Sequence, residues 1–146
     1  FTERRIIVKQ IIDWTSKKIW AALTDLELYN TQNAFTVIPH SGFIHEYILA
    51  LLNSRLMSFY HKKVFVDEYK ARFQKLLIKE CKLFPIKPAD SKTQSAFKTT
   101  VDKILKSKSK NPNADTSLLE LEIDKLVYKL YNLTDEEILI VEQSYV

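Results

Sequence analysis

The side chains that could catalyse a reaction or hold a metal are few, and they are poorly spaced for either purpose. His40, His45 and His61 fit no zinc-ligand spacing, so we expect ordinary surface or partly buried histidines. Cys81 is the only cysteine, which excludes a disulfide framework, and its alternation with a nearby leucine favours a small buried hydrophobic side chain. The run 67–70 (Asp-Glu-Tyr-Lys) lacks the separation of a nuclease Asp…Glu-x-Lys metal site. These patterns predict neither a catalytic centre nor a metal site.

A single glycine, Gly42, excludes several further classes of active site. Phosphate-cradling loops and dinucleotide-binding fingerprints need two or three glycines at fixed spacing, because the backbone must approach the phosphate groups closely. The chain therefore holds no P-loop, no Rossmann nucleotide site and no G-x-S-x-G nucleophile elbow. So few glycines also disfavour an all-β fold built on many tight turns.

Two polar segments carry side chains suited to recognition. The net charge of +4 permits a nucleic-acid partner through phosphate neutralisation but does not establish one. Arginine can bond guanine, and asparagine or glutamine can bond adenine, while lysine suits phosphate groups. The first segment carries Lys70, Arg72, Gln74 and Lys75, and the second, 29–33, carries Asn30, Gln32 and Asn33. The plainer alternatives are a solvated charged loop and an ordinary turn.

Other basic residues could supply phosphate contacts, although lysines at strand edges more often serve to block aggregation. They are Arg4, Arg5, Lys9, Lys17, Lys18, Lys62 and Lys63. The densest basic run, 103–110, is better explained as a solvated helix end.

The elements that would position these residues begin with three strands. Segments 4–12, 18–24 and 34–38 are rich in β-branched residues and are separated by turn-like sequences. A long helix over 43–65 follows, with apolar residues at three- and four-residue spacing. We expect 66–75 to be a loop and 76–79 to be a short strand or turn, with 76–86 contributing to the sheet. Trp14 and Trp20 are expected in the core.

The last third of the sequence predicts helices. Ser91-x-x-Gln94 and Thr134-x-x-Glu137 are capping-box patterns, each before an apolar periodic stretch. A second helix is expected over 117–131, and 106–115 is interpreted as an exposed connection. Because each longer helix has one apolar face, the two should form an antiparallel hairpin. The predicted fold is α+β: a small, mostly antiparallel sheet packed on a long helix, followed by a C-terminal helical hairpin.

The amino-acid composition restricts the class of protein further. At 46% apolar and 27% charged, the chain is an ordinary globular protein. No stretch approaches the ~18 apolar residues of a membrane span, and the start is unlike a signal peptide. The only methionine is Met57, so we interpret the chain as a fragment of a longer protein. The lone cysteine favours a cytoplasmic setting.

Three stretches resemble a known family. Residues 48–60 (ILALLNSRLMSFY) resemble the "LLNSKL–FY" helix of TaqI-like C-terminal specificity domains, which occur in fused restriction–methyltransferase enzymes and are related to type I specificity subunits. Residues 78–86 (IKECKLFPI) are similar to the segment that follows, and 123–142 (IDKLVYKLYNLTDEEILIVE) to the helical tail. The pieces stand in family order. Asn132 replaces the usual glycine, which a helix C-terminus tolerates.

The resemblance implies a division of labour. Residues 1–90 would recognise a double-stranded DNA target, and 91–146 would form a helical spacer or docking segment. In such domains the polar loop corresponding to 70–75 faces DNA. Catalysis would lie upstream in the same polypeptide, because this chain has no N-P-P-Y methylation motif. S-adenosylmethionine and magnesium would be needed only there. The alternative is a helical protein–protein interaction or structural module of a larger assembly.

Overall fold

A computed structural model describes residues 3–12, 15–29, 31–66 and 74–145. Three strands come first, and six helices complete the described chain. The strands are β1 (Arg5–Lys9), β2 (Ala21–Thr24) and β3 (Ala34–Val37). The helices are α1 (His45–Asn53), α2 (Arg55–Phe65), α3 (Ile78–Cys81), α4 (Ser91–Lys110), α5 (Ser117–Leu130) and α6 (Asp135–Gln143). The predicted α+β class, with its antiparallel sheet and C-terminal helices, is confirmed.

The sheet has the order β2-β1-β3, with β1 antiparallel to both neighbours. Ile6 and Val8 of β1 are fully buried and face the helices, whereas Lys9 is exposed at the strand's end. This alternation follows from the two-residue period of a strand, which sends successive side chains to opposite faces. The three predicted strands are therefore present, each shorter than its apolar stretch.

The predicted return of 76–86 to the sheet is wrong. Among the described residues, this region meets the sheet through one bridge, Ile11 with Lys75, and then forms helix α3. The Glu80 carboxylate accepts the backbone N–H of Leu77 at 3.0 Å, which supports the start of a helical turn. The ring of His61, buried in α2, lies 3.0 Å from the same Glu80 oxygen and ties α3 to α2.

The single helix predicted over 43–65 is two helices that meet at Ser54. The backbone of Ser54 is extended (φ −68°, ψ 152°), and its hydroxyl accepts the N–H of Met57 at 3.2 Å, so it caps α2. Serine competes for helical backbone groups and therefore favours such caps. The apolar periodicity continues across the break, which is why the pattern alone reads as one helix.

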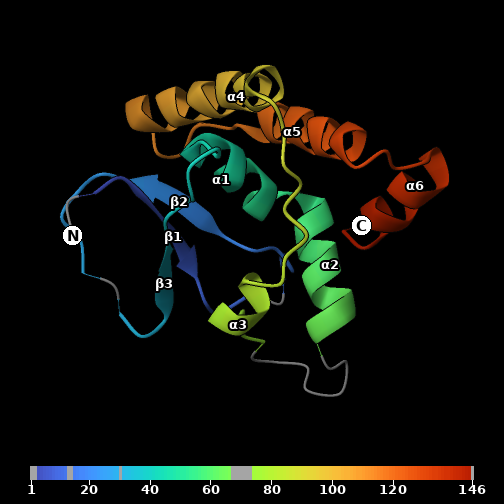
Figure 1. Cartoon of the computed structure of the whole chain (residues 1–146), viewed down its shortest axis with the longest axis horizontal. Helices are drawn as coiled ribbons and strands as arrows, with labels where there is room; N and C mark the ends of the chain where they lie inside the picture. Colours follow the sequence, from blue (N-terminus) through green and yellow to red (C-terminus); the bar gives the residue numbers. More distant parts are fainter. Residues whose placement is uncertain (1–2, 13–14, 30, 67–73, 146) are drawn as a thin grey trace.

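Helix α1 lies at the centre of the molecule. It packs against β2 on one side and α4 on the other, and α4 packs along α5 as the predicted hairpin. Figure 1 shows α1 between the sheet and this hairpin. Helices α2 and α6 lie beside each other on the right of the view, away from the sheet. Buried side chains from the sheet, α1, α2, α4 and α5 form one continuous core, including Ile6, Val8, Tyr47, Leu51, Met57, Phe97, Val101, Ile123 and Val127.

The observed ends of the helices test the predicted capping boxes and the predicted connection between α4 and α5. The box at Thr134 and Glu137 is confirmed in both directions, at 3.2 and 2.8 Å. The box at Ser91 is wrong, because Asp90 caps α4 and the Gln94 amide instead bonds the Gly42 carbonyl at 2.7 Å. The predicted connection 106–115 is shorter than expected, since α4 continues to Lys110. The expected boundary near residue 90 stays a prediction.

Candidate nucleic-acid interface

Several predicted recognition residues meet at the carboxyl end of β1. Gln10 donates its backbone N–H to Asn33 at 2.8 Å, and its carbonyl accepts from Leu76 at 2.7 Å. The backbone of Gln74 accepts the N–H of Ile12 at 3.0 Å, beside the Ile11–Lys75 bridge. Segments 31–34 and 74–76 therefore flank the chain that leaves β1. The register of the sheet, and not proximity in sequence, brings together Lys9, Gln32, Asn33, Gln74 and Lys75.

Most of this group is open to solvent. Lys9, Gln32, Asn33 and Lys75 are exposed, and Gln74 is half-buried. Gln32 and Asn33 occupy the centre of a tight turn, which the hydrogen bond from Ala34 N–H to the Thr31 carbonyl closes at 3.1 Å. Their amides thus stand at a turn tip directly before β3. The geometry fits both expectations for this segment, an ordinary turn and a base-reading loop.

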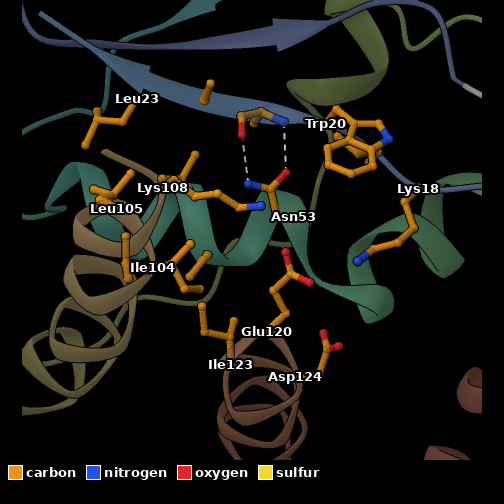
Figure 2. A pocket seen from close by; sticks show the side chains of 16 residues that line it. Lys18, Trp20, Leu23, Asn53, Ile104, Leu105, Lys108, Glu120, Ile123 and Asp124 are labelled. Carbon is orange, nitrogen blue, oxygen red and sulfur yellow. Dashed lines mark hydrogen bonds between the residues drawn. The ribbon is translucent and has the colours of Figure 1, made fainter. Parts of the chain in front are cut away.

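Lys17 and Lys18 precede β2 at this same end of the sheet. Lys17 is exposed and has a positive φ of 55°. Lys18 is half-buried and turns the other way, toward α5, where it lies in the field of Asp124 (Figure 2). Burial raises the pKa of Asp124, and hydrogen bonding and the charges of Lys18 and Arg55 oppose that rise. Lys18 is therefore partly engaged within the protein, whereas Lys17 is not buried.

Arg4 and Arg5 lie at the opposite end of β1. Arg4 donates to Glu46 at 2.6 Å, and Lys98 of α4 approaches the same carboxylate at 3.2 Å. Arg5 is 1% exposed, and its guanidinium donates to the carbonyls of Glu3 at 3.0 Å and Leu28 at 2.8 Å. Both side chains thus stabilise the fold, and Arg5 presents no free surface for a phosphate.

The remaining predicted contacts, Asn30, Lys70 and Arg72, lie outside the described residues, as does the acidic run that begins at Asp67. Their part in any interface stays a prediction. The neighbouring Lys62 and Lys63 are at the carboxyl end of α2, where Lys63 is exposed and its ammonium lies 5.8 Å from the centre of the Phe59 ring.

Sequence reasoning misplaced Trp20. It was expected in the core but is 52% exposed, so that expectation is wrong; Trp14 lies outside the described residues. The signal that could have placed it is alternation, because the preceding Ile19 is buried and successive side chains of an extended stretch point to opposite faces. His61 was also misjudged, because it is buried between α2 and α3 with Glu80 as its partner.

The motif 53–55 that carries the family resemblance has a structural role. The side-chain amide of Asn53 accepts the N–H of Ala21 at 2.8 Å and donates to its carbonyl at 2.9 Å (Figure 2). Ala21 is on the edge strand β2, so this amide occupies the place that another strand would take. Ser58 of α2 also accepts the N–H of Ile19 at 3.0 Å. The chain around Trp20 is therefore fixed to α1 and α2.

A groove runs between this strand and the helical hairpin. Its volume is about 320 Å³, and Figure 2 shows its lining from β2, α1, α4 and α5. Leu23, Ile104, Leu105 and Ile123 make it largely apolar, with Lys18 and Asp124 at one side.

Within the described ranges, no group of three or more His, Cys, Asp or Glu residues could hold a metal ion. No helix of the described part is long and apolar enough to span a membrane. A comparison with curated proteins finds no match. Residues 1–86, more than half of the chain, match the TaqI-like C-terminal specificity domain, and the match ends before α4. The chain therefore belongs to the family of TaqI-like C-terminal specificity domains.

Proposed function

We propose that this domain recognises double-stranded DNA for a bacterial restriction–modification enzyme and catalyses no reaction itself. The observation that carries the proposal is the group of exposed lysines and amides at the carboxyl end of β1: Lys9, Lys17, Gln32, Asn33 and Lys75. Lysines neutralise phosphates and set the position on the duplex, while amides reach base edges. Membership of a specificity-domain family supports this assignment.

The parent protein would be a cytoplasmic type II restriction enzyme with an adenine methyltransferase upstream of this domain. S-adenosylmethionine and magnesium would serve that upstream part. Asn30, Lys70 and Arg72 would add to the same interface. Arg4 and Arg5 are left out of it, because their partners are Glu46 and backbone carbonyls.

Binding to labelled random-sequence duplex DNA at several salt concentrations tests the proposal. We expect log affinity to fall linearly with log salt, because each neutralised phosphate releases counterions. The double change Lys9→Ala and Lys75→Ala should weaken binding and lower the magnitude of the slope by roughly 2, about one for each lost phosphate contact.

The matched control is Lys125→Ala with Lys129→Ala, two exposed lysines of α5 whose loss changes the net charge equally. If both double variants weaken binding to the same extent, attraction is by net charge alone and the interface is misplaced. If the unchanged domain does not bind at low salt, the proposal fails.

A second candidate function is a helical protein-interaction module. It is favoured by exposed apolar side chains on α5 and α6: Leu118 is 82% exposed, Leu139 57% and Ile140 55%. Leu139 and Ile140 are neighbours on α6, and exposed apolar side chains that lie together mark interaction sites. Sedimentation over a range of concentrations tests it: self-association that Leu139→Ser and Ile140→Ser abolish would support this function.

A further inference from the structure

The indole of Trp20 is presented to solvent by a rigid stretch of backbone. Its carbonyl accepts the N–H of Lys9 at 2.9 Å. Both neighbouring residues are anchored from the helices, Ile19 by the Ser58 hydroxyl and Ala21 by the Asn53 amide. The ring nitrogen lies 3.4 Å from the Ser16 hydroxyl. Exposing an indole gives up its burial free energy, and here the loss occurs at a well-anchored position, which favours a binding role.

An open hollow lies beside this ring on the outer face of the sheet. It has a volume of about 240 Å³ and is lined by Ile7, Lys9, Trp20, Ala21, Ala22 and Ala34. In the sheet register Ala22 stands opposite Ile7, and Ala34 stands opposite Lys9. Because side chains at opposed positions share a face, two alanines beside longer side chains leave this space unfilled. The hollow is apolar, apart from Lys9.

One polar side chain suited to DNA lines the hollow, and two more belong to the turn that leads into it. Lys9 is exposed there and can place a phosphate. The turn residues Gln32 and Asn33 directly precede Ala34, one of the residues that line the hollow. An apolar recess lined by one cation, with an amide-bearing turn leading into it, fits a DNA groove better than it fits another protein's apolar face.

We propose that this hollow receives the 5-methyl group of a thymine in the major groove, packed against Trp20 and Ala22. The thymine methyl is the apolar group that a base pair presents in that groove. An amide of Gln32 or Asn33 would bond the adenine of the same pair, so the domain reads an A·T pair here. The inference rests on the proposed function and adds a base and its contacts.

Replacing thymine by uracil tests the proposal, because it removes the methyl group and keeps every Watson–Crick hydrogen bond. A preferred duplex is first selected from a random library with the unchanged domain, and each thymine is then replaced singly by deoxyuridine. We expect one position at which the replacement lowers affinity roughly fourfold, as for the loss of one buried methylene-sized group.

Two variants should abolish that difference while the protein stays folded, as judged by circular dichroism. Trp20→Ala removes the wall of the hollow, and Ala22→Met fills it from an exposed position. Leu26→Ala is the matched control, since Leu26 is an apolar side chain 64% exposed that does not line the hollow. It should keep the preference for thymine.

The outcomes separate this inference from the proposed function. Salt-dependent binding without a thymine-to-uracil effect at any position overturns the inference and leaves DNA binding standing. So does an effect that persists in Trp20→Ala and Ala22→Met. Absence of salt-dependent binding overturns both.

Discussion

The carboxylate of Asp124 accepts the backbone N–H of Arg55 at 2.9 Å and lies 3.7 Å from the guanidinium of the same residue. Arg55 is the first residue of α2, so a side chain of α5 satisfies one of the free amide groups at the start of another helix. The negative charge also stands at the positive end of the α2 dipole. The same guanidinium donates to Glu142 of α6, which joins three helices at one point.

Replacing Asp124 should therefore destabilise the fold, and the loss should be smaller when the new side chain can still accept a hydrogen bond from the Arg55 N–H. Asp124→Ala leaves the Arg55 amide and guanidinium without this partner, and we expect a loss of about 1–3 kcal/mol in the free energy of unfolding. Asp124→Asn should lose less, because an amide oxygen can still accept the N–H. Urea denaturation measures both, with Lys125→Ala as a control expected within about 0.5 kcal/mol of the unchanged chain. Equal losses for Asn and Ala would contradict the role of the amide contact.

The buried carboxylate of Glu46 should make stability depend on acid pH. Burial alone would raise its pKa, but hydrogen bonds from its own backbone, Arg4 and Lys98 hold the pKa below the ordinary value of 4.5. A lowered folded-state pKa stabilises the protein above the unfolded pKa, and this contribution disappears as pH falls through the folded pKa. The stability difference from Glu46→Gln should thus be largest above pH 4.5 and shrink on acidification. A difference that is constant between pH 7 and pH 3 would refute this.

Asn132 ends α5 in the left-handed region, with φ 53°. The N–H of Leu133 reaches the Tyr128 carbonyl at 3.0 Å and that of Asn132 reaches Lys129 at 3.2 Å, the two bonds of a Schellman motif. Asn132→Ala should cost about 1 kcal/mol, because a Cβ disfavours this conformation without asparagine's local bonding. Asn132→Gly should be neutral or stabilising. In thermal melts the alanine variant should lie roughly 2–4 °C lower, and a glycine variant that melts lower still would overturn the explanation.

The thiol of Cys81 should react slowly in the folded protein. Burial raises its pKa to about 11 from an ordinary 9.0, which leaves about 100-fold less thiolate, the reactive form, at pH 8. Reaction with a disulfide reagent at pH 8 should accelerate by about that factor when urea unfolds the chain. Equal rates with and without urea would show that the thiol is accessible and ionises normally.

Local patterns predicted the parts of the fold that local forces determine. β-Branched stretches gave the three strands, and the Thr134–Glu137 spacing gave the start of α6. The break at Ser54 was missed because its cause is partly remote: Asn53 bonds Ala21 and Arg55 bonds Asp124. Partners so far away in the chain leave no mark on an apolar periodicity.

The difference between local patterns and remote contacts also explains which residues of the candidate interface the sequence could predict. Lys9, Asn33 and Lys75 come together through strand register, which the sequence predicts only once the pairing order is known. Arg5 was included because it is a cation, but the segment that passes over that end of the sheet supplies the Leu28 carbonyl to its guanidinium. No property of the residue itself indicates such a partner.

The junction at 53–55 has a consequence for how the chain can change. Three consecutive side chains serve three separate parts: Asn53 holds β2, Ser54 starts α2, and the Arg55 guanidinium pairs with carboxylates of α5 and α6. One inserted or deleted residue there would uncouple all of them at once. Gln32 and Asn33, by contrast, sit on an exposed turn closed by backbone bonds. Substitutions are therefore tolerated best on the exposed turn. Single changes there can alter the side chains offered to a ligand while the junction at 53–55 keeps the fold unchanged.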